Sequence, residues 1–166
     1  MNGAHWHLML NHFPAIGGIF SALILFAGVV FKNASFRKAG LGILIISGLI
    51  AIPVLLSGED AVDTLKAIGQ KNNLIRPHAK AARVAFWVLE ATATLGLLAF
   101  FMAFKKEELS KKLATITLIG TLIATGLFLN VNNLGGVIRH TEIRTGNTSL
   151  APDSTNAIGA GEKDND

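Results

Sequence analysis

Histidine is the residue type in this chain with the most evident capacity for chemistry. The chain has no cysteine, which excludes a thiolate metal site, covalent haem attachment through a CxxCH motif, a disulfide framework and a cysteine nucleophile. Any metal or cofactor is therefore expected to be held mainly by imidazole nitrogens, with carboxylates or amides in support. The five histidines are His5, His7, His12, His78 and His140.

One potential metal ligand adjoins each of four long apolar segments of the chain. His12 precedes the first segment, Glu59 follows the second, His78 precedes the third and His140 follows the fourth. If consecutive segments cross a membrane in opposite directions, these four groups share one end of the bundle. Three imidazoles and a carboxylate form a ligand set for zinc, copper or iron. A non-haem metal site is therefore one hypothesis.

A b-type haem is the other cofactor hypothesis, because two neutral imidazoles from facing helices can serve as its axial ligands. Arginine side chains near the same end of the bundle could neutralise the haem propionates. A third interpretation is that the histidines bind nothing and lie amphipathically in the lipid headgroup region. The candidate haem-binding residues are His12, His78 and His140 as ligands, with Arg76, Arg83 and Arg139 for the propionates.

The N-terminal segment favours His12 over His7 as a ligand. His5 and His12 are seven residues apart and would share one face of a helix, whereas His7 would point elsewhere. Pro14 suits a first helical turn, and Asn11 could cap that helix. We therefore expect His12 to lie at the mouth of the bundle.

The elements that must position these residues are four apolar helices. Of the 166 residues, 51% are hydrophobic and only 16% are charged, whereas soluble domains are about a quarter charged. Each apolar segment has about the 20 residues that a helix needs to cross a bilayer. A backbone in lipid must also satisfy its own hydrogen bonds, which requires helices. The predicted spans are 13–31, 39–57, 79–104 and 113–137.

The predicted fold class is therefore all-α: an integral membrane four-helix bundle with antiparallel up-down topology. Residues 1–12 form an interfacial N-terminal segment, residues 13–140 the bundle, and the polar residues 141–166 a disordered tail. No lysine or arginine precedes the first span and no cleavage box follows it, so we expect that span to be retained. The connection over residues 58–78 has the pattern of a short amphipathic helix at the interface.

Charge predicts the orientation rather than a binding partner. The net charge is +4, and the short loops near residues 32–38 and 105–112 carry a dense set of cations. The positive-inside rule then places these loops in the cytoplasm and both termini on the outer, periplasmic face of a bacterial inner membrane. The cations flank membrane spans without interleaved aromatic residues, so the bilayer is the expected partner and nucleic acid is not.

Within the spans, Glu90 is the residue that most needs an explanation. A carboxylate at this depth is costly unless it faces the bundle interior or water, so Glu90 is either a proton or ion relay or an acid kept neutral by Asn130, Thr92 or Thr94. Close packing or a kink is expected at Pro53 and at several glycines. Those glycines are Gly17, Gly18, Gly40, Gly42 and Gly48.

Two short motifs resemble those of a known family. His7-Leu-Met-Leu-Asn-His12-Phe-Pro14 and Leu134-Gly-Gly-Val-Ile-Arg-His140 are similar to the signature boxes of a domain-of-unknown-function family of small bacterial four-helix membrane proteins. The resemblance covers residues 5–142, with a shorter spacing from the glycines to His140 than the commoner form. It implies an integral membrane protein that binds haem or serves respiratory and redox complexes.

The function predicted from the sequence is that of a membrane electron-transfer subunit with a b-type haem near the periplasmic face. The alternatives are a membrane protein that binds a non-haem metal and a non-catalytic accessory subunit of a larger membrane complex. The chain has no phosphate-binding glycine loop, nucleophile elbow or His-Glu-x-x-His helix. These absences favour an electron-transfer or accessory subunit with a redox partner over a stand-alone enzyme.

Overall fold

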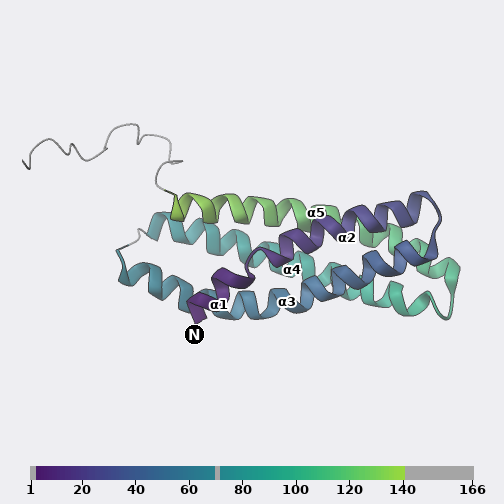
Figure 1. Cartoon of the computed structure of the whole chain (residues 1–166), viewed down its shortest axis with the longest axis horizontal. Helices are drawn as coiled ribbons and strands as arrows, with labels where there is room; N and C mark the ends of the chain where they lie inside the picture. The colour runs from purple at the N-terminus through teal and green to yellow at the C-terminus, as the bar shows by residue number, and fades with distance from the viewer. Residues whose placement is uncertain (1–2, 70–71, 141–166) are drawn as a thin grey trace, which may run out of the picture.

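The computed structural model describes residues 3–69 and 72–140, and this part of the chain is helical without strands. Four units are long and apolar enough to cross a membrane: Gly3–Val30, which comprises α1 and α2, and then α3, α4 and α5. The expectation of an all-α chain with four such helices is confirmed. The helices are α1 (Gly3–Leu10), α2 (Phe13–Val30), α3 (Ala34–Ala67), α4 (Asn72–Met102) and α5 (Glu107–Arg139) (Figure 1).

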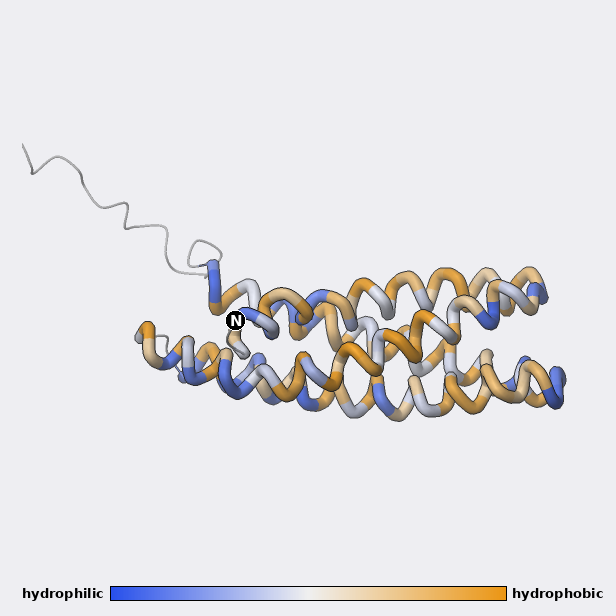
Figure 2. Tube along the Cα trace, turned by 60° about the horizontal axis from the view of Figure 1, so that its bottom comes forward, coloured by the Kyte–Doolittle hydropathy of each residue, from blue (hydrophilic) through white to orange (hydrophobic). Residues whose placement is uncertain are grey.

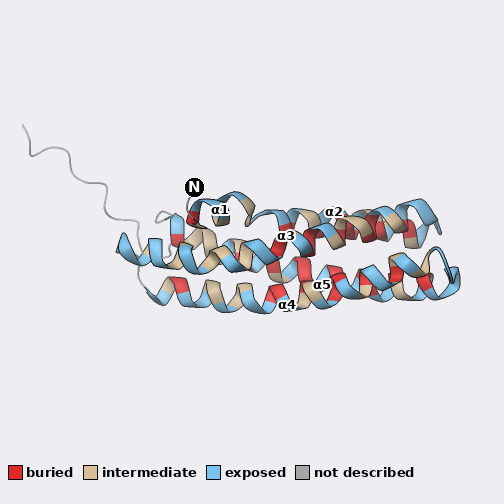
Figure 3. Ribbon diagram, turned by 90° about the horizontal axis from the view of Figure 1, so that it is seen from below, coloured by how far each residue is buried: buried red, intermediate tan, exposed pale blue. Residues whose placement is uncertain are grey.

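The helices form one elongated bundle. Helix α4 packs along α5 and α3, α2 packs along α3 and α5, and α1 lies against α3 (Figure 1). Buried residues follow the sides on which the helices face one another (Figure 3), while large apolar side chains such as Leu23, Trp87 and Ile123 point outward. Hydrophobic residues dominate the middle of each long helix (Figure 2). Such an apolar exterior suits contact with lipid.

The connections between the helices gather at the two ends of the bundle (Figure 1), and the two ends differ in their residues. At one, which we call the lysine end, the α2–α3 and α4–α5 connections lie together, because Arg37 pairs with Glu107 at 3.4 Å. There Asn33 caps α3 by accepting hydrogen bonds from the amides of Ser35 and Phe36, at 2.9 and 3.1 Å. At the other, the histidine end, lie α1, the end of α3, the start of α4 and the end of α5.

Helix α3 is longer than predicted, because the expected interfacial helix is continuous with the second span. The helix runs through Pro53 and on to Ala67, and α4 then begins at Asn72. Proline removes a backbone donor from the helix. The Ser57 hydroxyl lies one turn later and donates to the carbonyl of Pro53 at 2.7 Å. Because α3 continues to Ala67, the amphipathic residues 58–67 extend this membrane-capable helix instead of forming a separate one.

The expectation of close packing holds for several glycines but not for Gly42. A Cβ on Gly40 would lie 2.7 Å from the backbone nitrogen of Leu25 in α2, so the backbones of α2 and α3 nearly touch there. The Ser21 hydroxyl donates to the carbonyl of Gly40 at 2.9 Å and joins the same two helices. A Cβ on Gly42, in contrast, would have nothing within 4 Å, so the prediction was wrong at this position.

Candidate functional site

His7 on α1 is one of two histidines that the structure turns toward the bundle. Its ring nitrogen Nδ1 lies 2.9 Å from the carbonyl oxygen of Val54 on α3. The ring edge packs on Gly58, where a Cβ would lie 3.6 Å from His7 Cε1. His7 therefore joins α1 to the second half of α3, and its side chain is half-buried.

His78 on α4 is the second inward histidine, and its surroundings repeat those of His7. Its Nδ1 lies 3.1 Å from the carbonyl oxygen of Val131 on α5. Its Cε1 faces Gly135, where a Cβ would lie 3.3 Å away. In both cases the ring bonds to a carbonyl of a neighbouring helix and packs on a glycine one turn later in that helix.

These contacts fix the tautomer of both rings. A carbonyl oxygen can only accept a hydrogen bond, so Nδ1 of His7 and Nδ1 of His78 each carry the hydrogen and donate it. In the neutral ring, Nε2 then has a free lone pair. A histidine that ligates a metal commonly has this arrangement, in which the other ring nitrogen donates to a carbonyl or carboxylate and holds the ring in place.

The two rings lie at the same end of the bundle, and His78 borders its core, because Val131 belongs to the main core cluster. Beyond the main core cluster, Ile75 on α4 and Ile138 on α5 are also buried toward the histidine end. Between α1 and α2, Oδ1 of Asn11 is buried without a hydrogen-bond partner, so the expected capping bond to α2 is not formed.

The structure does not gather the ligands that the sequence suggested for a metal. His12, Glu59 and His140 are exposed, and only His78 of the predicted set is half-buried. Over residues 3–69 and 72–140, no group of three or more histidine, aspartate or glutamate side chains is arranged to hold a metal ion. The three-histidine-plus-glutamate set is therefore not brought together in the described part of the chain.

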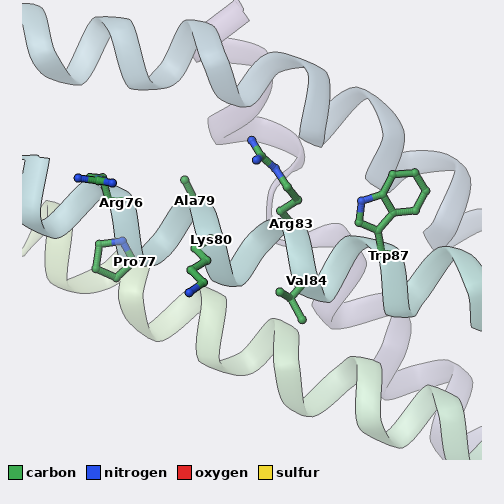
Figure 4. A pocket seen from close by; sticks show the side chains of 7 residues that line it. All are labelled: Arg76, Pro77, Ala79, Lys80, Arg83, Val84 and Trp87. Carbon is green, nitrogen blue, oxygen red and sulfur yellow. The ribbon is translucent and has the colours of Figure 1, made fainter.

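Two of the three predicted propionate partners also lie away from the helix face of His78. Arg76 and Arg83 point to the same side of α4 and line an open cavity of about 730 Å³ (Figure 4). In a helix with 3.6 residues per turn, His78 is about 200° around the axis from Arg76 and about 140° from Arg83. Arg139 is exposed at the end of α5. Arg76 and Arg83 thus do not share the helix face of His78, whereas Arg139 lies one turn beyond Gly135 on α5 and is exposed.

A pattern in the sequence could have identified His7. Membrane helices place small residues against one another and large apolar residues toward lipid. Stepping by three or four residues from His7 along α1 and α2 leads through Asn11, Pro14 and Gly18 to Ser21, and the last three of these are buried. His5 and His12 instead fall on the stripe of large exposed residues.

The comparisons add no relative: the chain matches no protein-family model, no curated protein and no solved structure. The resemblance of the two histidine-containing motifs to the family of small four-helix membrane proteins thus stays a prediction.

Proposed function

We propose that this chain is an integral membrane electron-transfer subunit in which His7 and His78 would hold a b-type haem through their Nε2 nitrogens. The bundle has antiparallel up-down topology in a bacterial inner membrane. Its lysine end faces the cytoplasm, and its histidine end, with both termini, faces the periplasm. The haem supplies one-electron chemistry, and the chain passes electrons between a membrane partner, such as a quinol or a larger complex, and a periplasmic acceptor.

The observation that carries this proposal is the matched anchoring of the two inward imidazoles. Each donates from Nδ1 to a carbonyl of a neighbouring helix, which leaves Nε2 free to act as a ligand. Two such nitrogens from different helices could together hold the iron of a b-type haem. This ligand pair replaces the choice among His12, His78 and His140 that the sequence suggested, since His12 and His140 are exposed.

The surrounding residues have two tasks in this proposal. The carbonyls of Val54 and Val131 hold the rings in one orientation and increase the basicity of their free nitrogens. Gly58 and Gly135 leave room beside the ring edges, where larger side chains would press on the imidazoles. The apolar exterior of the helices keeps bulk water away from the sides of the site.

The proposal is tested by the haem content of single histidine variants purified from haem-replete cells. His7→Ala and His78→Ala should each lose most of the bound haem, because each removes one axial ligand. His5→Ala and His12→Ala are matched controls on exposed positions of the same segment and should keep the wild-type haem-to-protein ratio. Wild-type haem content in both His7→Ala and His78→Ala would contradict the proposal.

A conservative variant separates ligation from a structural role. Methionine can also ligate haem iron, and it raises the reduction potential relative to histidine. His78→Met should therefore keep part of the haem and show a higher potential than the wild type. If His78 has only a structural role, His78→Met should either lose its haem or keep it with the reduction potential of the wild type.

A further inference from the structure

Among the carboxyl side chains of residues 3–69 and 72–140, only that of Glu90 belongs to a residue that is not exposed, and Glu90 has no role in the haem proposal. The predicted spans 13–31, 39–57 and 113–137 contain no ionisable side chain. The span 79–104 contains three, and they are Lys80, Arg83 and Glu90. Glu90 thus stands as a single acid in the middle of the membrane-spanning part of α4.

The carboxyl group faces helix α3 and lacks a hydrogen-bond partner on one oxygen. A Cβ on Gly48 of α3 would lie 3.5 Å from Glu90 Oε1 and 3.6 Å from Oε2, so the carboxyl packs against the bare backbone of that helix. Oε1 is buried and makes no hydrogen bond. An ionised carboxylate in such surroundings is costly, whereas a protonated one is tolerated.

The partners expected from the sequence are occupied or turned away. Thr92 Oγ1 donates to the carbonyl of Val88 at 2.7 Å, and Thr94 Oγ1 donates to the backbone carbonyl of Glu90 itself at 2.8 Å. Asn130 is exposed. None of these three side chains therefore neutralises the Glu90 carboxyl by a hydrogen bond.

No charge from a neighbouring helix faces Glu90. Helix α2 carries no ionisable side chain, α3 has none between Lys38 and Glu59, and α5 has none between Lys112 and Arg139. On α4, Arg83 shares the face of Glu90 because it precedes it by seven residues, about 10 Å along the axis. Arg83 is thus the nearest ionisable residue on that face and the one that can bias the charge of Glu90.

An open cavity lies along the exposed side of α4, between the histidine end and the turn that precedes Glu90. The cavity of about 730 Å³ runs along α4 from Arg76 past Arg83 to Trp87, less than one turn before Glu90 (Figure 4). Its cationic side chains, Arg76, Lys80 and Arg83, lie in the part nearer the histidine end, where they can hold water. The ion pairs formed in the described part of the chain include neither Arg76 nor Arg83.

We propose that Glu90 is a proton-binding site in the middle of the bundle, and that it exchanges its proton with water at the histidine end through the cavity lined by Arg76, Arg83 and Trp87. The ligand is a proton, held by the carboxyl against the backbone of Gly48. The proposal stands without the haem, because it depends on α3, α4 and the cavity alone.

A membrane-soluble carbodiimide tests the protonation of Glu90 in the full-length protein. The acid proton moves to a carbodiimide nitrogen and the carboxyl oxygen adds to the central carbon; the adduct then rearranges to a stable N-acylurea without loss of any atom. Peptide mapping of the wild type with dicyclohexylcarbodiimide should find one main adduct, at Glu90, that declines as pH rises. Glu90→Gln should abolish it and Glu59→Gln, at an exposed position, should keep it. Failure to label Glu90 at any pH would overturn the proposal.

A second variant tests the link between Glu90 and the cavity. The positive charge of Arg83 favours the ionised carboxylate, so Arg83→Gln should let labelling persist to higher pH than in the wild type. Arg76→Gln is the matched control, because Arg76 lines the same cavity but lies about 21 Å from Glu90 along the axis. An unchanged pH profile in Arg83→Gln would refute the link.

Discussion

The crossing of α2 and α3 at Gly40 gives the sharpest test of the packing. In Gly40→Ala the new methyl group would lie 2.7 to 2.9 Å from three atoms of Leu25, namely N, Cβ and Cα. These atoms belong to or adjoin the backbone, so no side-chain rotation relieves the contact and the two helices must separate. Overpacking of this kind costs about 2 kcal/mol. Separation also stretches the buried hydrogen bond from Ser21 to the Gly40 carbonyl, worth about 1 kcal/mol.

Gly42→Ala is the matched control, two residues further along the same helix. Nothing lies within 4 Å of the position that its new methyl group would take, so this variant receives only the gain from a better helix former, at most about 1 kcal/mol. Gly40→Ala receives the same gain, which offsets part of the two costs given above. We therefore expect its free energy of unfolding to fall by about 2 kcal/mol, about a 30-fold change in the unfolding equilibrium. Reversible unfolding in mixed detergent micelles measures both variants. Equal stabilities would refute the close crossing.

Two further substitutions test the lysine end and the candidate site. Ser110→Ala removes a buried hydrogen bond of 2.8 Å to the carbonyl of Ala99, so the free energy of unfolding in the same micelles should fall by about 1 kcal/mol, and an unchanged value would contradict the contact. Gly135→Leu places a side chain against His78 and should turn its ring away from the carbonyl that orients it. Loss of such an orienting contact weakens metal binding, so a haem titration should show about tenfold weaker binding. Gly126→Leu, where a Cβ on the same helix would meet open space, should bind haem like the wild type, and equal affinities in both variants would oppose the assignment.

Hydropathy was sufficient to predict the four membrane-capable helices, because a long charge-poor apolar segment has few other stable structures in lipid. It did not predict where α3 ends. Residues 58–67 have an amphipathic pattern that fits equally well as a separate interfacial helix or as an extension of the second span. In the structure α1 packs against this half of α3, as in the hydrogen bond from His7 to Val54, and such a tertiary contact leaves no periodic signal in the sequence.

The candidate site was harder to predict than the fold, because it depends on helix rotation. His78 was identified from its place before the third span, and the structure turns it inward. The spacing correctly placed His5 and His12 on one side of the segment and His7 on another, but the side of His12 was taken as the inward one, and the structure exposes it. Small residues on the inward stripe were the better guide, because close packing in a membrane selects them.

The most direct test of the central claim is the visible absorption spectrum of the wild-type protein, purified in detergent from haem-replete cells and measured before and after reduction with dithionite. A b-type haem held by His7 and His78 predicts a Soret band in the oxidised protein and a sharp α band after reduction, both absent from the His7→Ala and His78→Ala variants. A colourless wild-type protein, or identical spectra in the wild type and both variants, would contradict it.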